Sequence, residues 1–545
     1  MVTPQIFHRA PLLRIAVMLI LGIFIGDRLG HWLHPAAGFI FSAGCFLTVV
    51  LLKIKYGKTS YHFPLLNSCI LLLAFFFLGF FLITQKKQLI SRQFPSEEIS
   101  YKAILISEPV IRGKVIQCDL ITVGQHPIRL RASILRDTIE HRYLQLHAGD
   151  GIQALSYIKS VNEMTQRPTW SQSHFNLQRW LQVQGITGQT FIYSANWQQH
   201  PACRMSLPMM ERTRLRLLKL RQKAIENLRE SGLDGQEHAI VAAMVLGDRS
   251  AITKEMRETY SVSGASHVLA LSGLHLGIIY WLLSLLFVHM RWQRLGQLVT
   301  LPAIWIFSLM VGFSPSIVRA ATMLTICSFV MLLRRQPLSL NSLSLAALVM
   351  LVANPLSLWD VGFQLSFMAV LAIVCFYRPI ERTIKYSFAI CPDGILQNRI
   401  IRTILLWMTG IIAVSLATQL LVAPLVAYYF GRFPTYFLLT NLVAIPLVTF
   451  ILYFAVLYFL ILAFTSITGL SIPILQSFVN QTLNLCSFTL NNTLGHIASF
   501  PGSSIEGLQL NEWQLVLVYI LIGGIIYIIA ILRRNLHDNK LYQQR

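Results

Sequence analysis

The sequence predicts a polytopic α-helical membrane protein that carries one small all-β domain between its first helices and the remainder. Three observations lead to this fold class. Of the 545 residues, 54% are hydrophobic and only 12% are charged, whereas soluble domains carry about 25% charged residues. Apolar runs long enough to cross a bilayer recur in both terminal parts of the chain. A stretch of short, alternating, strand-like runs separates them.

The first part, residues 1–85, contains three apolar runs, at about 10–26, 38–52 and 64–84. A bilayer core of about 30 Å needs roughly 20 apolar residues per helix, which these runs approximate. Lys53, Lys55 and Lys58 lie between the second and third runs, and short lysine-rich loops remain on the cytoplasmic side of a membrane. The pattern therefore predicts three membrane helices, a cytoplasmic N-terminus and an extracytoplasmic location for the residues that follow.

Residues 86–200 are predicted to form the β-domain. Apolar and polar residues alternate along "IRLRASI", a period of two that buries one face and places Arg129 and Arg131 on the other. Five such strands in about a hundred residues fit a closed barrel of the OB type, although another five-stranded topology fits the same pattern. The five strand-like runs are 101–106, 114–123, 128–135, 151–158 and 186–193.

The eight cysteines form no C-x-x-C pair, so the sequence predicts neither a zinc site nor a dithiol redox motif. Only Cys118 and Cys203 fall between the two membrane blocks. In an oxidising compartment they would form a disulfide; two separate buried thiols are the alternative.

Residues 201–260 are expected to connect the β-domain to the second membrane block through a basic amphipathic helix. The segment 211–230 reads "ERTRLRLLKLRQKAIENLRE". At 100° per residue its basic side chains fall on one stripe, with Leu217, Ala224, Ile225 and Leu228 opposite. The stripe contacts either solvent and lipid headgroups or a polyanion passing towards the membrane. Its members are Arg212, Arg216, Lys219 and Lys223.

The last part, residues 261–545, is predicted to be a polytopic helical domain, which brings the total to about 11–12 transmembrane helices. The two short runs at 297–313 and 338–353 either cross the bilayer or re-enter it. A ninth, weaker run lies at 473–498. The eight clearer runs are at about 265–289, 297–313, 315–333, 338–353, 359–377, 403–429, 436–463 and 512–532.

Polar residues at the ends of these apolar runs are the first candidate functional residues. In "SHVLALSGLHLG", residues 266–277, the glycines Gly273 and Gly277 predict close helix packing around His275. A charge at membrane depth is costly, so it is normally paired or functional. Arg319 and Asp360 are such charges, and they either pair with each other or contact a substrate.

Two further patterns point to polar groups deeper in the runs. Gln419 precedes Pro424 by five residues, and Asn441 precedes Pro446 by the same spacing. Proline frees backbone groups within a helix, which indicates either a broken helix at a transport site or an ordinary kink. The run 473–498 carries an uncharged polar stripe, which suits a water-filled passage and an interfacial helix equally. That stripe consists of Gln476, Asn480, Asn484, Ser487 and Asn491.

No catalytic or cofactor motif is recognised in the sequence. It has no H-x-H-x-D-H run of a metallo-β-lactamase-type nuclease and no GxxxxGK[ST] loop for ATP. The expectation is therefore a transport protein without metal, cofactor, nuclease or ATPase activity of its own. Ser272 and His275 would be the residues of an intramembrane hydrolase, but no acid that would orient the histidine lies nearby in the sequence.

Four sequence blocks resemble the ComEC family, the inner-membrane channel proteins of bacterial DNA uptake. They are "VLGDRSAITKEMRETYSVSGASHVLALSGLHLGII", "GFSPSIVRAATML", "NPLSLWDVGFQLSFMAVLAI" and "FGRFPTYFLLTNLVAIPLV", in order across residues 245–450. "WSQSHFNLQRWLQVQGI", residues 170–186, is similar to the family segment that closes the N-terminal OB-like domain, with Ser-Gln-Ser where Asn-Pro-Gly is commoner. The chain departs from many members because "RRNLHDNKLYQQR" follows Leu532 where they continue into a metallo-β-lactamase-like domain.

The resemblance implies that one strand of incoming DNA crosses the inner membrane through the C-terminal domain, while the OB-like domain receives it in the periplasm. It implies membrane lipid, single-stranded DNA, a periplasmic DNA receptor, a cytoplasmic DNA-translocating ATPase and a separate nuclease as partners. Gln419 and Asn441, recognised from their spacing to Pro424 and Pro446, are also counted among the candidate path or gate residues. The path or gate residues that the resemblance carries over are Asp248, Arg249, Ser272, His275, Arg319, Asp360 and Gln364.

Composition is compatible with this function. The formal net charge of +22 indicates an anionic neighbour, which is either lipid headgroups or nucleic acid. Proteins that bind single strands combine basic grooves with aromatic platforms. The expected outer surface consists of Arg129, Arg131 and the basic stripe, with stacking or core positions at Tyr143, Tyr157, Tyr193 and Trp197. Transport or flipping of another anionic substrate is the alternative.

Overall fold

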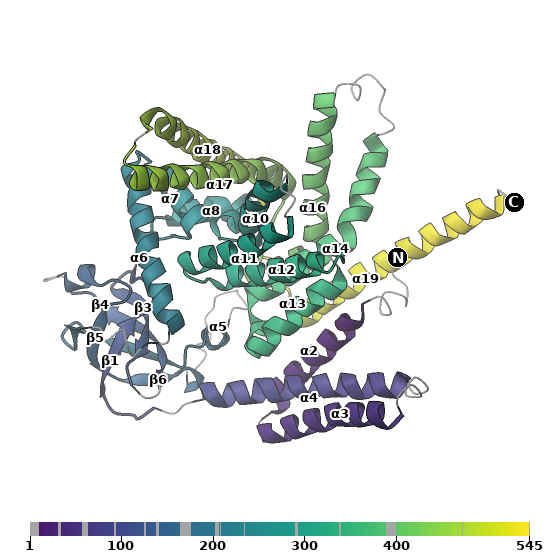
Figure 1. The fold of residues 1–545 in the computed structure, drawn as a ribbon, viewed down its shortest axis with the longest axis horizontal. Helices are drawn as coiled ribbons and strands as arrows, with labels where there is room; N and C mark the ends of the chain where they lie inside the picture. Colours follow the sequence, from purple (N-terminus) through teal and green to yellow (C-terminus); the bar gives the residue numbers. More distant parts are fainter. Residues whose placement is uncertain are drawn as a thin grey trace.

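The structure is a computed structural model. It describes residues 10–30, 34–56, 64–91, 94–124, 127–137, 141–163, 176–201, 207, 209–233, 235–288, 293–336, 339–388, 399–470 and 472–543. Figure 1 shows a β-domain beside a large helical part, with the N-terminal helices along one side of that part. The fold class predicted from the sequence is confirmed.

The N-terminal helices are α2 (Pro11–Leu29), α3 (Pro35–Tyr56) and α4 (Pro64–Ile90). Small residues let α2 and α4 approach closely, as expected for helices that associate in lipid. A Cβ on Gly22 would overlap the backbone of Phe76, and one on Gly79 would overlap the backbone of Leu19. The pair packs against α13, so this part is joined to the C-terminal helices through a shared apolar cluster.

The β-domain contains all five predicted strands and three short ones that the sequence pattern did not reveal. The order β6-β7-β4-β3-β1-β5-β8 includes one parallel pair, β4 with β7, and β2 pairs with β3 at the side. The strands are β1 (Ile99–Leu105), β2 (Val110–Arg112), β3 (Val115–Thr122), β4 (Arg129–Leu135), β5 (Gly151–Ser156), β6 (Ile158–Ser160), β7 (Gly188–Ile192) and β8 (Trp197–His200). The short helices are η2 (Arg142–Gln145), η3 (Val161–Glu163) and α5 (Leu177–Val183).

The strand order closes a barrel, because β5 pairs with β1 and its continuation β6 pairs with β7. A buried polar contact marks the closure: the Ser156 and Thr190 hydroxyls are 2.6 Å apart, and the Tyr101 hydroxyl lies 3.0 Å from Ser156. This is the OB-type arrangement expected from the five strands. Cys118 is a free thiol in the barrel core, where burial raises its pKa to about 12. Cys203 lies outside the described residues, as do 170–175 of the family-like segment.

The connector consists of α6 (Met209–Glu230), α7 (Gly235–Val241), the π-helical segment η5 (Ala242–Leu246) and α8 (Lys254–Val262). The predicted amphipathic helix is present, but its buried face differs from the prediction. Leu215, Leu218, Ile225 and Leu228 are buried, whereas Leu217 and Ala224 are only half-buried. Ile225 and Leu228 are thus confirmed, and the other two differ because α6 packs on the β-domain near its start, on α11, and on α17 near its end.

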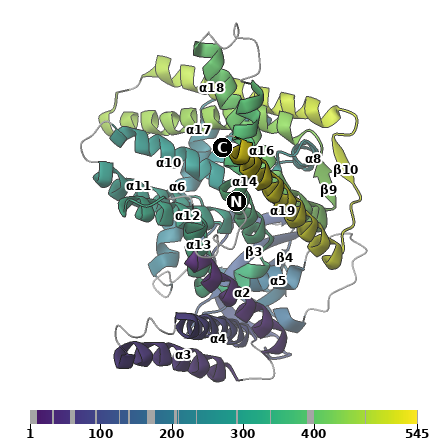
Figure 2. The same ribbon diagram turned by 90° about the vertical axis from the view of Figure 1, so that its right-hand side faces the viewer.

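The C-terminal part is helical throughout apart from two short paired strands. In order it contains α9 (Ser266–Leu269), α10 (Gly273–Val288), α11 (Gln293–Met310), α12 (Pro315–Leu332), α13 (Leu340–Ala353), η6 (Pro355–Trp359), α14 (Val361–Phe388), α16 (Arg399–Phe430), β9 (Arg432–Pro434), α17 (Phe437–Thr468), α18 (Pro473–Ser499), β10 (Ser504–Glu506) and α19 (Glu512–Gln543). Figure 2 shows α10 to α14 enclosed between the N-terminal helices and the α17–α18 pair. The helices that hold His275, Arg319 and Gln364 therefore lie between these two groups of helices.

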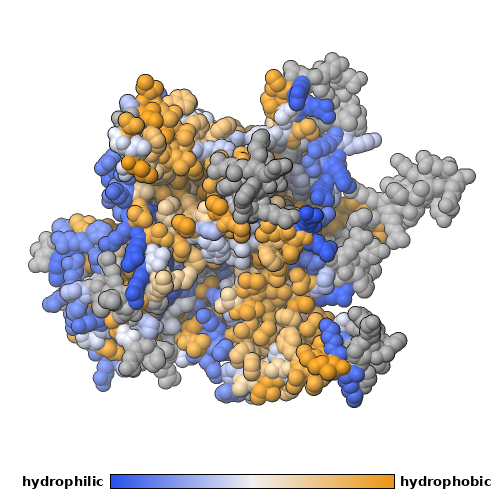
Figure 3. Space-filling model, in the orientation of Figure 1, coloured by the Kyte–Doolittle hydropathy of each residue, from blue (hydrophilic) through white to orange (hydrophobic). Residues whose placement is uncertain are grey.

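Among the described residues, seven helices are long and apolar enough to cross a membrane, and three further apolar helices are shorter. The seven include α3, α4, α12, α14, α16, α17 and most of α19. Two predicted spans, α2 and α18, form helices of 19 and 27 residues but are not among the seven. The helix α2 is apolar but carries three charged residues, Arg14, Asp27 and Arg28, whereas the amide side chains of α18 lower its mean hydropathy. Figure 3 shows apolar side chains over the helical part and mainly hydrophilic ones over the β-domain.

Two local predictions in the C-terminal part need correction, and one pair of alternatives is decided. The run 265–289 is not one helix, because the chain is extended between α9 and α10. Of the two alternatives at Pro424 and Pro446, a broken helix is ruled out, since α16 and α17 continue through both prolines. A Cβ on Gly277 would have no neighbouring atom within 4 Å, so close packing involves only Gly273, whose Cβ would lie 3.6 Å from Ala320.

Candidate functional site

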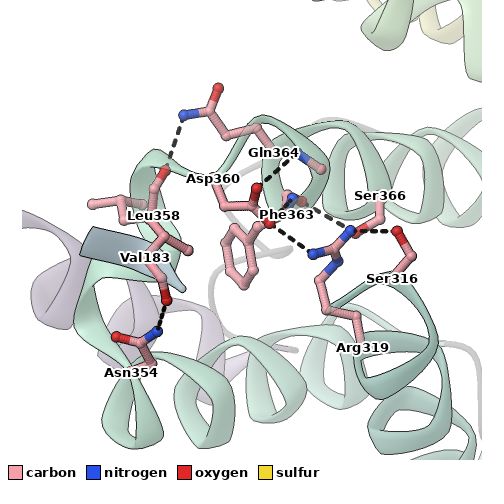
Figure 4. Close-up of polar contacts among 10 residues, drawn as sticks. Val183, Ser316, Arg319, Asn354, Leu358, Asp360, Phe363, Gln364 and Ser366 are labelled. Atoms are coloured by element: carbon pink, nitrogen blue, oxygen red, sulfur yellow. Dashed lines mark hydrogen bonds and ion pairs between the residues drawn. The ribbon is translucent and has the colours of Figure 1, made fainter. Parts of the chain in front are cut away.

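Arg319 and Asp360 form an ion pair inside the helical part, as Figure 4 shows. The Arg319 Nη1 atom donates to Asp360 Oδ2 over 2.7 Å, and Nη2 donates to the Ser316 hydroxyl over 3.0 Å. The two side chains are 9% and 16% exposed. Removing charges from water is expensive, so a pair this buried needs further hydrogen bonds to be tolerated.

Asp360 supplies some of these bonds because it also caps α14. Its carboxylate accepts the backbone N–H of Phe363 over 3.1 Å and that of Gly362 over 3.4 Å. An aspartate at the start of a helix satisfies free backbone donors and lies at the positive end of the helix dipole. Gly362 leaves room for the guanidinium, because a Cβ there would lie 2.6 Å from Arg319 Nη2. Asp360, which caps α14 and pairs with Arg319, and Gly362, which leaves room for the guanidinium, therefore lie within one helical turn.

Gln364 joins α14 to its neighbours. Its amide donates to the Leu358 carbonyl over 2.9 Å and its oxygen accepts the Tyr429 hydroxyl over 2.8 Å. Tyr429 belongs to α16, which is also held by the Tyr519 hydroxyl of α19 through the Leu421 carbonyl. The predicted residue Gln364 thus holds η6, α14 and α16 together.

Ser272 and His275 form a helix cap at the start of α10. The Ser272 hydroxyl lies 2.9 Å from His275 Nδ1, and the Ser272 backbone N–H donates to the same nitrogen over 3.4 Å. Nδ1 therefore accepts, and we infer that Nε2 carries the proton of the neutral ring. Nε2 is buried without a protein partner among the described residues. No acid orients this histidine there, so the geometry is that of a cap and lacks the third group of a nucleophilic site.

Asn441 and Gln419 lie on neighbouring helices. The Asn441 amide donates to the Ser415 hydroxyl over 3.0 Å, which joins α17 to α16. The Asn441 oxygen is buried and has no protein partner among the described atoms. Gln419 is half-buried one helical turn beyond Ser415. Asn441 therefore lies at the α16–α17 contact, and Gln419 follows one turn further along α16.

Asp248 and Arg249 follow η5 and lie apart from this group. The Asp248 carboxylate accepts the backbone N–H and hydroxyl of Ser250 and lies 3.9 Å from Arg221 of α6. Burial lowers the pKa of Arg221, an effect that Asp248 and Glu108 oppose. Arg249 is exposed. Asp248 thus links the segment that follows η5 to α6.

The polar stripe of α18 faces the junction of α6 and α7 rather than the Arg319–Asp360 pair. Asn480 donates to the Ser231 carbonyl over 3.0 Å, and Asn491 donates to Gln236 over 2.6 Å. Gln476, Asn480 and Asn484 line an open cleft of about 410 Å³ together with residues 230–232. Ser487 is fully buried and bonds to its own helix. The stripe and the ion pair are two separate polar regions.

The two arginines of β4 are engaged within the protein. Arg129 pairs with Glu211 of α6. Arg131 pairs with Asp119 of β3 and lies over the Trp180 ring at 5.0 Å. The basic stripe of α6 is more exposed, although Arg212 is half-buried and donates to the Leu207 carbonyl. The other three stripe residues, Arg216, Lys219 and Lys223, are exposed and form no ion pair within the described part of the chain.

The aromatic residues of the β-domain divide into two classes. Tyr143 and Trp197 are buried, 6% and 3% exposed, and each lies beside an arginine of the domain. Tyr157 and Tyr193 are 51% and 56% exposed. Phe191, which the sequence reasoning missed, is 43% exposed and its ring lies 5.2 Å from that of Tyr193. Strand alternation along β7 places both on the outer face and could have revealed Phe191.

Other residues of the site were also missed by the sequence reasoning. Tyr429 precedes the "FGRFP" block but belongs to no recognisable motif. Arg432, inside that block, bonds to Glu258, Glu506 and the Ser261 hydroxyl and so joins α8 to the β9–β10 pair. A lone arginine after a predicted helix gave no indication of partners so distant in the sequence. Across the described residues, no group of three or more His, Cys, Asp or Glu side chains is placed to hold a metal ion.

Comparison with known proteins identifies the family. The family described as "Competence protein" matches residues 244–533. The chain is 28% identical over 244 residues to "ComE operon protein 3" of Bacillus subtilis, 24% identical over 294 residues to "Recombination protein 2" of Haemophilus influenzae, and 24% identical over 229 residues to "Uncharacterized protein YcaI" of Escherichia coli. These matches cover 44%, 51% and 39% of this chain.

The chain spans about a third of the length of these relatives, with 28%, 33% and 28% of each covered. No solved structure matches the chain. The family match includes α10 to α18 and hence the ion pair, its capping contacts and the α16–α17 contact. Because that match extends over more than half of the residues, this multi-pass membrane protein belongs to the ComEC-type competence protein family.

Proposed function

We propose that this chain forms the inner-membrane path by which a single strand of DNA reaches the cytoplasm during natural transformation. In this proposal the β-domain lies in the periplasm and the N-terminus in the cytoplasm. A periplasmic DNA receptor delivers the DNA, a separate nuclease removes the other strand and a cytoplasmic ATPase supplies the energy. Family membership and the net charge of +22 support an anionic cargo.

The observation that carries the proposal is a set of buried polar atoms without protein partners at predicted path residues. His275 Nε2, Arg319 Nε and Asn441 Oδ1 are such atoms, on three different helices of the described C-terminal part. Each unsatisfied buried group costs about 1–3 kcal/mol unless water or a substrate satisfies it. A dry apolar bundle gains nothing from such residues, whereas a hydrated path needs them. The polar residues within apolar runs of the sequence support the same proposal, because such residues are costly in a membrane and are usually functional.

The outer surface is proposed to hold the strand before it enters. Arg216, Lys219 and Lys223 form an exposed basic ridge on α6, and Tyr157, Phe191 and Tyr193 present exposed rings on the β-domain. Proteins that bind single strands use basic surfaces for the backbone and aromatic faces for the bases. The ridge and the rings are therefore proposed to act on different parts of the same ligand.

Neutralising the α6 ridge by Arg216→Gln, Lys219→Gln and Lys223→Gln is expected to weaken binding of a single-stranded oligonucleotide. Each phosphate contact contributes about 0.7 to the slope of log affinity against log salt, so loss of three contacts should flatten the slope by about 2. The measurement is fluorescence anisotropy of the full chain in nanodiscs over a range of salt concentrations.

The matched control is Arg378→Gln, Arg382→Gln and Arg399→Gln, which removes three exposed charges from α14 and α16 instead. We expect this control to leave the slope near that of the unaltered chain. An equal loss in both variants would mean that DNA responds to overall charge rather than to the ridge.

The function itself is tested by deleting the gene in a naturally competent host. Transformation by external DNA should be abolished and restored by the intact gene, while labelled DNA still accumulates outside the inner membrane. Normal transformation in the deletion strain would overturn the proposal. Intact transformation together with accumulation of an anionic lipid-linked glycan would favour the alternative transport function instead.

A further inference from the structure

Arg179 lies where three parts of the molecule meet. It belongs to α5 of the β-domain, and its Nη1 atom donates to Asp27 Oδ1 of α2 over 2.8 Å while Nη2 binds the other carboxylate oxygen. On its other side the guanidinium lies over the Trp359 ring of η6, 4.8 Å from the ring centre. A two-point arginine–carboxylate contact fixes direction as well as distance.

Asp27 is held ready for this contact by the N-terminal helices. Its side chain is only 6% exposed, and Lys87 of α4 binds both its carboxylate, over 2.7 Å, and its backbone carbonyl, over 2.6 Å. One carboxylate therefore serves two cations from different elements. Without Arg179 the pair Asp27–Lys87 would remain, but nothing charged would join it to the β-domain through this carboxylate.

A second contact fixes the other end of α5. The Asn354 amide, directly before η6, donates to the Val183 carbonyl over 3.1 Å. Val183 also packs in an apolar cluster with Leu358 and Trp359. The helix α5 is thus attached to both ends of η6, by Asn354 at one end and by Trp359 at the other (Figure 4 shows the Asn354 contact).

The residue after Trp359 is Asp360, which holds Arg319. Leu358, inside η6, accepts the hydrogen bond of Gln364. A displacement of η6 would therefore move the cap of α14 and the ion pair together. The contact between η6 and the β-domain is made through α5, while α4, α13 and α14 also pack on η6.

We infer that Arg179 is a positioning residue that docks the β-domain on η6 and so sets the place of the domain relative to the Arg319–Asp360 pair. This inference deepens the proposed function and rests on it for the role in DNA uptake. The docking itself involves no DNA and is measured without it. Arg179 is 28% exposed, so its contacts with Asp27 and Trp359 are partly shielded from solvent.

Arg142 provides a matched control within the same domain. Its Nε atom donates to Asp137 over 3.2 Å, and its guanidinium lies over the Trp197 ring at 5.6 Å. It thus combines a carboxylate with an indole ring, as Arg179 does, but these partners and the Ser194 carbonyl, to which it also donates, belong to the β-domain. We expect Arg142→Gln to remove the same kinds of contact and to leave the docking of the domain unchanged.

Docking is measured by cross-linking Val183→Cys to Asn354→Cys with bismaleimidoethane, in the full chain with its native cysteines replaced. Asn354→Cys removes the amide bond to the Val183 carbonyl, so docking in this chain depends on the Arg179 contacts and on the apolar packing of α5. The yield of linked peptides is quantified by mass spectrometry. Adding Arg179→Gln should lower the yield about tenfold, because it removes a shielded charge pair, whereas adding Arg142→Gln should leave it unchanged. An unchanged yield with Arg179→Gln would overturn the docking role.

Uptake is then compared in the same host for Arg179→Gln, Arg179→Lys and Arg142→Gln. We expect Arg179→Gln to lower transformation about tenfold or more, Arg179→Lys to retain part of it, and the cross-link to restore it in Arg179→Gln. Full uptake in Arg179→Gln with a reduced cross-link yield would overturn the positioning role, as would failure of the cross-link to restore it. Normal uptake in the strain that lacks the gene would instead contradict the proposed function.

Discussion

Replacing Asp360 by asparagine is expected to destabilise the C-terminal helices and abolish DNA uptake. Asparagine caps a helix about as well as aspartate, so the start of α14 should be retained. The lost charge leaves Arg319, which is 9% exposed, without its counter-ion. Removing one partner of a buried ion pair costs about 3–5 kcal/mol, a large part of the stability of a folded domain. Folded yield in detergent and the transformation frequency are the two measurements.

A second variant separates stability from passage. Arg319→Met combined with Asp360→Asn removes both charges and keeps the cap, and a buried pair replaced by an apolar group is often neutral for stability. We expect the folded yield to return while uptake remains lost, because the pair is proposed to contact the strand or gate its path. Recovery of uptake together with yield would show that the pair is only structural.

Gly362→Ala probes the same place without altering any charge. The added Cβ would lie 2.6 Å from Arg319 Nη2, so the guanidinium must move while Asp360 is unchanged. We expect reduced uptake with a nearly normal folded yield, since the clash involves the flexible end of a side chain. Wild-type uptake in this variant would indicate that the position of the guanidinium is unimportant.

Much of the fold could be predicted from the sequence because each signal is local. The alternation along β4 and the four other runs predicted the barrel strands, and apolar runs predicted most helices. The charges Arg319 and Asp360 were recognisable because a charge in an apolar run is costly wherever it lies. The sequence left open whether these residues pair with each other, because that depends on the distance between them. In the structure Arg319 Nη1 lies 2.7 Å from Asp360 Oδ2.

The rest could not be predicted because it depends on contacts between distant segments. The α18 stripe has the periodicity of a channel wall, yet Asn480 and Asn491 bond to the end of α6 and the start of α7. The break before Gly273 is stabilised by Ser272 and His275, which cap α10, and neither residue alone predicts a helix start there. The alternation along β4 predicts that Arg131 points outward, but in the structure it forms an ion pair with Asp119 on the neighbouring strand.

Substituting alanine at both Gly22 and Gly79 is expected to separate α2 from α4 and prevent correct assembly. A Cβ at either position would overlap backbone atoms of the other helix, which cannot turn aside as a side chain can. Overpacking a tight contact costs about 1–3 kcal/mol per site. Because both substitutions act on one crossing, their effects should be coupled rather than simply additive. Separation would also shift Asp27 and the apolar cluster shared with α13, so both folded yield and uptake should fall.

Gly44 of α3 is the matched control, since nothing lies within 4 Å of the Cβ position there. Alanine favours a helix over glycine by about 1 kcal/mol, so Gly44→Ala should leave folded yield unchanged or slightly raised. The comparison isolates close approach from the general effect of losing a glycine. Equal folded yields for the Gly22, Gly79 double variant and the Gly44 variant would contradict the crossing. A reduced yield confined to the double variant would show that the close backbone approach of α2 and α4 at these two glycines is required for correct assembly.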